Sequence, residues 1–323
     1  MPNEDAYKRF LANFGMSVSQ VPPILPQDLM GNVLGLLNRQ KGQIAKSQQS
    51  QFSELLKAYE TNTTNLIMQN ISRDLSKRIA QLGLPKQCDV YAGVFPTNSF
   101  NAQATLVGNG ALVLIDVGCF SLIEAITMLF AWNGDMERKT VLACQFIKRY
   151  VSDYAIPSPK EYDHPSLHDG IRLMAFTQVV SKAEEFVLAH EHAHVALGHL
   201  WTSKSKAMTP VGEVPMVSKS REQEIEADKL GVHLMLSTKL NDVVLKQIGA
   251  APYVVFGIAY LIEKAIESIH HTRYEHWDTH PPAVVRGALI ERAMSEWGVS
   301  KSLDLGQKIW GWVNECANRI QYV

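Results

Sequence analysis

One segment near the middle of the chain, His190-Glu191-His192-Ala193-His194, limits the fold more than any other feature. It lies in a stretch from Lys182 to Leu200 whose apolar residues repeat at helical spacing. His190 and His194 continue that apolar stripe, and residues four apart point the same way on a helix, one turn from each other. The pattern therefore predicts a buried helix with two imidazoles on its inward face.

Two imidazoles placed in this way suit a shared tetrahedral zinc ion. Glu191 is offset from His190 by roughly 100° around the helix, so it does not easily join the same ion but can reach a water bound there. This is the arrangement of the His-Glu-x-x-His motif, in which the glutamate is the general base. The alternative is a pair of core histidines that only satisfy hydrogen bonds; the full motif on a buried helix favours zinc.

A third metal ligand is expected about 30 residues later, in the acidic segment 220–228. Three glutamates compete for this place: Glu222, Glu224 and Glu226. Glu224 differs because Asp228 follows it by four residues on the same helix face, and a carboxylate there can accept the spare N–H of a metal-bound histidine. We therefore predict Glu224 as the ligand, Asp228 as the partner of a ligand, and the other two glutamates in solvent or in ion pairs.

The rest of the chain predicts a mainly helical α+β protein. Residues 1–26 end in a proline-punctuated stretch and are expected as an extended N-terminal arm, residues 27–84 as a helical region, and residues 85–323 as the main domain. Short β-prone segments separated by turn residues predict a small sheet near the start of that domain, at 89–95, 101–107 and 111–115. Most of the chain after residue 119 is expected to be helical, broken at 203–220.

Composition excludes several classes of function. A formal net charge of -1 and a pI near 6.8 provide no field that would attract nucleic acid or an anionic membrane. The apolar stretches 111–132 and 246–263 are interrupted by charged residues or proline, so we expect core elements and no integral membrane segment. The first residues include no apolar leader, so a cytoplasmic protein is expected. The four cysteines, with no CxxC pair, are expected as buried free thiols.

Three motifs in order resemble one peptidase family. They are His-Glu-x-x-His at 190–194, Glu-x-x-Ala-Asp at 224–228 and Thr-His-Pro-Pro-x-x-x-Arg at 279–286. This order resembles the gluzincin peptidases of the HtpX and CAAX-processing kind, including their soluble BepA-like relatives. Upstream, Asn101-Ala102-x-Ala104 and the segment 108–117 resemble the family's Asn-Ala strand and the edge strand after it. The resemblance covers roughly residues 95–290, in motifs rather than in continuous identity.

The resemblance implies a zincin-type metallopeptidase fold and roles for individual residues. His190, His194 and Glu224 would bind zinc, with Glu191 as the catalytic base. Asp228 would orient a ligand, and Arg286 would be a structural partner nearby. His280 would be a second catalytic residue, stabilising the oxyanion or occupying the zinc in a closed state. An edge strand including Ala111, Leu112 and Val113 would pair with an extended substrate peptide.

The expected function is therefore that of a zinc-dependent endopeptidase acting on protein or peptide substrates. Glu191 would take a proton from a zinc-activated water and return it to the leaving amine, with His280 or Tyr274 as an added donor to the carbonyl. The alternative is a latent or non-catalytic regulatory protein whose site is blocked by His280 or by the N-terminal region. The histidine-rich cluster 270–276 could form an extra metal site or a loop of solvated histidines, and the functions of His192 and His199 and the oligomeric state stay open. His199 would lie roughly 180° from His190 on a continuous helix, as a packing or surface residue.

Overall fold

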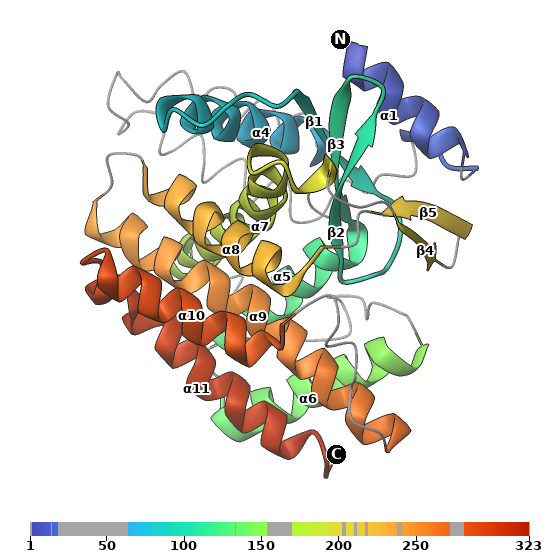
Figure 1. The fold of residues 1–323 in the computed structure, drawn as a ribbon. Coiled ribbons are helices and arrows are strands. Elements are labelled where there is room, and N and C mark those ends of the chain that lie inside the picture. The colour runs from blue at the N-terminus through green and yellow to red at the C-terminus, as the bar shows by residue number, and fades with distance from the viewer. Residues whose placement is uncertain are drawn as a thin grey trace.

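The computed structural model describes residues 2–13, 15–18, 64–132, 134–153, 170–201, 205–209, 212–216, 219–237, 241–271 and 281–322. Helices dominate these residues, and the strands form one three-stranded mixed sheet and one hairpin, so the α+β prediction is confirmed (Figure 1). The helices are α1 (Pro2–Asn13), α4 (Thr64–Gln81), α5 (Val117–Ala131), α6 (Met136–Asp153), α7 (Gly170–Ala196), α8 (Arg221–Leu236), α9 (Asp242–His270), α10 (Ala283–Glu296) and α11 (Asp304–Arg319). Two short 3₁₀ turns are η6 (His199–Trp201) and η8 (Ser300–Leu303).

The three-stranded sheet consists of β1 (Asp89–Phe95), β2 (Ala102–Val107) and β3 (Gly110–Asp116), in the order β1-β3-β2. All three strands were expected from the sequence, but their order corrects one expectation. The segment 111–113 was predicted as a substrate-binding edge strand, whereas β3 is the central strand, parallel to β1 and antiparallel to β2. Its backbone hydrogen-bonding groups are used on both sides, so Ala111, Leu112 and Val113 cannot add a substrate strand.

The N-terminal segment corrects a second expectation. Residues 2–13, within the predicted extended arm, form the helix α1. Tyr7, Phe10 and Leu11 lie at helical spacing and are buried against the face of the sheet that carries Tyr91 and Phe95. The Tyr7 hydroxyl also donates a hydrogen bond of 2.6 Å to the carbonyl of Val94. Packing against the sheet stabilises a helix too short to be stable alone, which explains why the arm is not extended.

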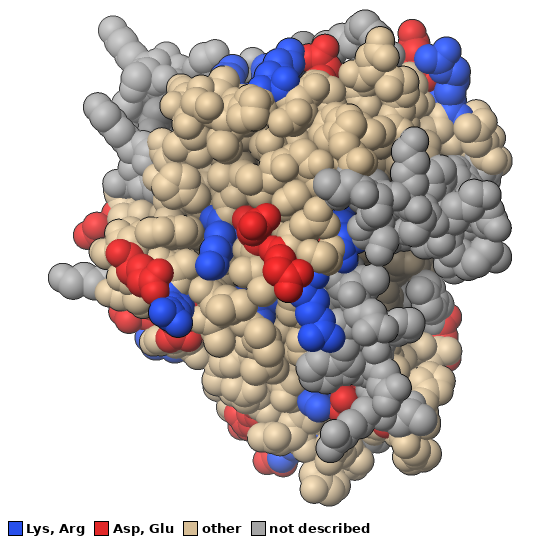
Figure 2. All heavy atoms as spheres, viewed as in Figure 1, with Lys and Arg blue, Asp and Glu red and all other residues tan. Residues whose placement is uncertain are grey.

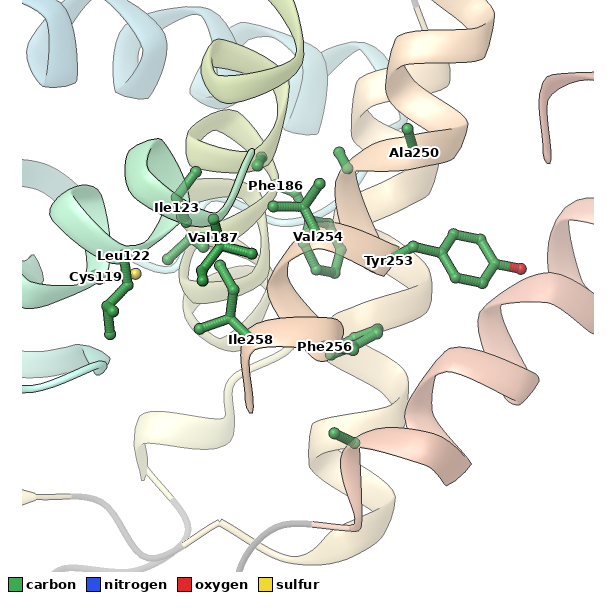
Figure 3. Close-up of a cluster of buried hydrophobic side chains, with 14 of the residues drawn as sticks. Cys119, Leu122, Ile123, Phe186, Val187, Ala250, Tyr253, Val254, Phe256 and Ile258 are labelled. Carbon is green, nitrogen blue, oxygen red and sulfur yellow. The ribbon is translucent and has the colours of Figure 1, made fainter. Parts of the chain in front are cut away.

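The opposite face of the sheet contributes to the main core. There β1 packs against α4, while β2 and β3 face α7, which runs between the sheet and the helices α8 and α9 (Figure 1). Figure 3 shows part of this core, where Phe186 of α7 meets Phe256 of α9 edge to face with ring centroids 5.6 Å apart. Leu122 and Ile123 of α5 pack on the other side of α7. The His-Glu-x-x-His helix is therefore held on several sides by apolar packing, which fixes its position.

Helix α9 contains the second apolar stretch. By length and composition it could cross a membrane, but 61% of its most apolar window is buried inside the protein. Its buried residues pack against α7, α10 and α11. The burial agrees with the expectation of a core element. A core helix that is mostly buried can meet the same length and hydropathy criteria as a membrane span.

Two further segments bear on the sequence predictions. The stretch 203–220 was expected only as a break in the helices, but it contains an antiparallel hairpin of β4 (Ser205–Thr209) and β5 (Gly212–Met216). Of the predicted N-terminal helical region, α4 is described, while residues 27–63 lie outside the described residues. The boundaries of the predicted domains stay predictions. On the face shown in Figure 2, Lys and Arg side chains lie interspersed with Asp and Glu.

Candidate metal centre and active site

Two helices bring the candidate metal ligands together. His190 and His194 come from α7, and Glu224 comes from the first turn of α8, which starts with a capping box at Ser220 and Gln223. The Nε2 atoms of the two histidines are 3.1 Å apart. The Glu224 carboxylate approaches both, with Oε1 3.3 Å from His194 Nε2 and Oε2 3.5 Å from His190 Nε2. All three side chains are buried.

These distances fit a shared metal ion. Two ligand atoms at roughly 2.0–2.1 Å from a tetrahedral ion are about 3.3 Å apart, close to each of the three separations observed. Glu191 is also within range, because atoms of His190, Glu191 and His194 that could bind an ion all lie within 4.8 Å of one another. Its Oε1 is 3.8 Å from His190 Nε2. Glu224 approaches both imidazoles more closely than Glu191 does, which makes it the stronger candidate for a third ligand.

Behind His190 lies a buried ion pair. The Nδ1 atom of His190 is 2.8 Å from Oδ1 of Asp228, which lies one turn beyond Glu224 on α8. Arg286 of α10 donates to the same carboxylate through both Nε, at 2.7 Å, and Nη2, at 2.6 Å. The arginine also lies over the Phe256 ring, with its guanidinium carbon 4.7 Å from the centroid. The two-pronged contact fixes the orientation of Asp228 and, through it, that of the His190 ring.

The close approach of α7 and α8 depends on Gly231. A Cβ built at this residue would lie 3.1 Å from the backbone nitrogen of His190 and 3.3 Å from its Cα. These are main-chain atoms that cannot rotate away. The glycine therefore sets the spacing between the helix with the histidines and the helix with Glu224 and Asp228.

His194 has a different partner. Its Nδ1 is 2.8 Å from Nδ1 of His199, whose Nε2 is 3.2 Å from Oε2 of Glu226. The prediction of a packing residue for His199 assumed that the helix continued through it, but α7 ends at Ala196. Gly198 then adopts a φ of 78°, which favours glycine, and reverses the chain so that His199 folds back against His194.

Glu191 has a cationic partner that the sequence did not indicate. Lys219, the residue before the capping box of α8, donates from Nζ to Glu191 Oε2 at 3.0 Å, and both side chains are buried. Burial alone would raise the pKa of Glu191, but Lys219 and then His190 outweigh it, and the pKa is lowered. The carboxylate is thus kept ionised, as a proton acceptor must be. The two partners are 28 positions apart in the sequence, which explains why no local pattern predicted the contact.

The pKa values of the two histidines are shifted in opposite directions. Burial works to lower the pKa of His190, but Asp228 and Glu224 raise it to about 9. For His194, burial and the nearby Lys219 lower the pKa to about 3. Carboxylates that attract a proton to His190 also attract a metal cation, which competes with protons for the same nitrogen.

The remaining site residues fall in three groups. His280 and Tyr274, the predicted extra donors, lie outside the described residues. Ala111, Leu112 and Val113 lie in the central strand and are buried. His192 is also buried: its Nε2 is 2.9 Å from Ser72 Oγ of α4, and burial lowers its pKa to about 4. It lines a cavity of about 620 Å³ between α4, β1 and α7, which is separate from the metal ligands.

Comparison with known proteins bears on this centre. Peptidase U49, a family of peptidases, matches residues 138–310, which include the helices α7, α8 and α10 that supply the whole centre. The chain belongs to the peptidase U49 family. Membership of this family indicates proteolytic activity and a protein substrate. No curated protein and no solved structure matches the chain.

The matched residues 138–310 of the chain do not include the three-stranded sheet, which ends at Asp116. They do include Lys219, His199 and Glu226 as well as the candidate ligands. The match does not bear on the finer resemblance to the HtpX and CAAX-processing gluzincins, which stays a prediction. The match likewise does not identify the metal or the mechanism.

Proposed function

We propose that this U49 peptidase is a zinc-dependent endopeptidase with Glu191 as its general base. The observation that carries the proposal is the gathering of two imidazole nitrogens and one carboxylate, 3.1–3.5 Å from one another, with a second carboxylate beside them. Two histidines and one glutamate form a known ligand set of catalytic zinc, which leaves a coordination position open. The donor set contains no thiolate and only one carboxylate, which suits zinc better than calcium or magnesium.

Zinc, when bound by His190, His194 and Glu224, would supply Lewis-acid chemistry: activation of water and polarisation of the scissile carbonyl. The protein's own groups would then handle the proton. Glu191 Oε1, the oxygen nearer to His190 Nε2, would accept a proton from the attacking water and deliver it to the leaving amine nitrogen. Lys219 would hold Oε2 of the same carboxylate, so that one oxygen is fixed while the other moves the proton.

His190 is expected to be held as a ligand by Asp228 and Arg286. A neutral imidazole that binds a metal through Nε2 carries its hydrogen on Nδ1, which here faces Asp228 Oδ1. Arg286 keeps that carboxylate ionised, since burial would raise the pKa of Asp228 but the guanidinium lowers it. Asp228 and Arg286 would thus hold the ring in the orientation that zinc binding needs.

The test compares wild type with Glu191→Gln and Glu224→Ala, by zinc content and by cleavage of an unstructured protein. About one zinc per chain is expected in wild type and in Glu191→Gln, and strongly reduced zinc in Glu224→Ala. Turnover should fall by on the order of 100-fold or more in Glu191→Gln, since general-base catalysis contributes that much. Undiminished cleavage by Glu191→Gln, or a wild-type protein that takes up no zinc at neutral pH, would overturn the proposal.

A further inference from the structure

A chain of three side chains leads from the candidate metal centre to the protein surface. His194, fully buried, contacts His199 at 2.8 Å between the two Nδ1 atoms, and His199, also buried, contacts Glu226 at 3.2 Å between Nε2 and Oε2. The side chain of Glu226 is 61% exposed. The chain joins three elements, because His194 belongs to α7, His199 to η6 and Glu226 to α8.

The hydrogen positions follow from what each atom faces. His194 Nε2 faces Glu224 and His190, so a lone pair on Nε2 for a metal puts the ring hydrogen on Nδ1. That N–H can donate to the lone pair on His199 Nδ1. His199 then carries its own hydrogen on Nε2, where it donates to the Glu226 carboxylate. Each donor in this tautomer meets an acceptor, and the chain ends on an acceptor that needs no hydrogen of its own.

We propose that His199 and Glu226 are positioning residues of the metal centre, which hold His194 in the tautomer and orientation that bind zinc and so strengthen zinc binding. The inference rests on the proposed function, because it takes zinc as the ion. His190 and His194 would thus each be supported by a carboxylate, but in different ways. Asp228 acts on His190 directly, is buried and is clamped by Arg286. Glu226 acts on His194 through one intervening imidazole and faces water.

This difference predicts an order of effects. Partners that orient a metal-bound histidine are worth about 10- to 100-fold in metal affinity. Loss of the His199 imidazole removes the acceptor for His194 itself, so it should have an effect in that range. Loss of the Glu226 charge changes only the outer end of the chain from His194 to the surface, where the charge is partly solvated and screened. We therefore expect zinc affinity to fall by only about 2- to 10-fold.

The zinc affinity of the chain 1–323, measured by competition with a chromophoric chelator, tests the proposal. The variants are His199→Ala and Glu226→Gln, and the control is Glu222→Gln, which removes the same charge from an exposed residue on the first turn of the same helix. We expect zinc affinity to decrease from wild type to Glu226→Gln and further to His199→Ala, while Glu222→Gln binds zinc as tightly as wild type. Wild-type affinity in both His199→Ala and Glu226→Gln would overturn the proposal.

Thermal unfolding of the metal-free variants separates positioning from folding. A positioning role lowers zinc affinity while the melting temperature of metal-free Glu226→Gln stays at the wild-type value, since this side chain is on the surface. If His199→Ala fails to fold, Glu226→Gln alone decides. If Glu222→Gln weakens zinc binding as much as Glu226→Gln, the effect is general electrostatics and the proposal fails. A wild-type chain that binds no zinc contradicts the proposed function itself, whereas tight wild-type binding with unchanged variants contradicts only this inference.

Discussion

Single side chains around the His-Glu-x-x-His helix carry charges that the fold must accommodate. Asp116, at the end of β3, is 3% exposed, and burial raises the pKa of its carboxyl group to about 7. An acid whose pKa is higher in the folded than in the unfolded chain binds more protons when folded. Its ionisation therefore destabilises the protein as pH rises from about 4, the unfolded value, to about 7, and the cost is complete above that range.

Asp116→Asn tests this directly, because an amide cannot ionise. The melting temperature of the variant should exceed that of wild type at pH 8 by about 2 °C or more, and the gap should shrink or reverse at pH 5. Differential scanning fluorimetry at both pH values is sufficient. A gap of the same size at pH 5 and pH 8 would show that Asp116 is not the group responsible.

Lys219 allows two opposite expectations, and only one agrees with the proposed mechanism. If the ammonium holds Glu191 as an ionised base, Lys219→Met should lower kcat by about 10-fold or more with little change in KM, while Lys219→Arg keeps a cation and loses less. Zinc content should stay at the wild-type level in both variants, since Lys219 is not a ligand. Faster cleavage by Lys219→Met would instead mean that the lysine blocks the base.

Pairs of helices decide whether the ligands can meet, and α7 with α8 is the pair concerned. Gly231 allows their contact at His190, so Gly231→Val should push α8 away and carry Glu224 and Asp228 with it. We expect a loss of about 1–3 kcal/mol in the free energy of unfolding, as for other overpacked sites, together with weaker zinc binding.

The control for Gly231→Val is Gly311→Val, which adds the same side chain to the exposed side of α11, where no atom lies within 4 Å of the added Cβ. Urea unfolding measures the stability of both variants. Chelator competition should show weaker zinc binding for Gly231→Val and unchanged zinc binding for Gly311→Val. Equal behaviour of the two variants would mean that helix propensity, and not the α7–α8 spacing, causes the effect.

In the molecule as a whole, the candidate centre links segments that are adjacent only in the folded state. Because its ligands come from two helices, zinc should bind the folded chain far better than the unfolded chain and so stabilise it. Zinc at about 100 times its dissociation constant should raise the free energy of unfolding by about 2.7 kcal/mol, which raises the melting temperature by roughly 4 °C for a chain of this length. A chelator should reverse this increase in melting temperature, and zinc should raise the melting temperature of Glu224→Ala only slightly. A wild-type melting temperature that does not respond to zinc or chelator would contradict a centre shared by α7 and α8.

Much of this arrangement could be predicted from the sequence because it depends on local periodicity. Helical spacing alone places His190 beside His194 and Glu224 beside Asp228, and the structure brings these two pairs together. The strands at 89–95, 102–107 and 110–116 were also readable, since β-prone runs bounded by turn residues are local signals. The family resemblance pointed to Arg286, which lies against Asp228.

Tertiary structure decided what depends on contacts between distant segments. The position of β3 at the centre of the sheet follows from which strands pair on each side of it, and α1 is a helix because the sheet offers an apolar face to cover. Lys219 reaches Glu191, and His199 reaches His194, only through the way in which η6 and α8 pack against α7. The sequence by itself determined which side chains share a helix face, because a helix has a fixed period. Which faces meet was decided only by packing, because that choice depends on the whole core at once.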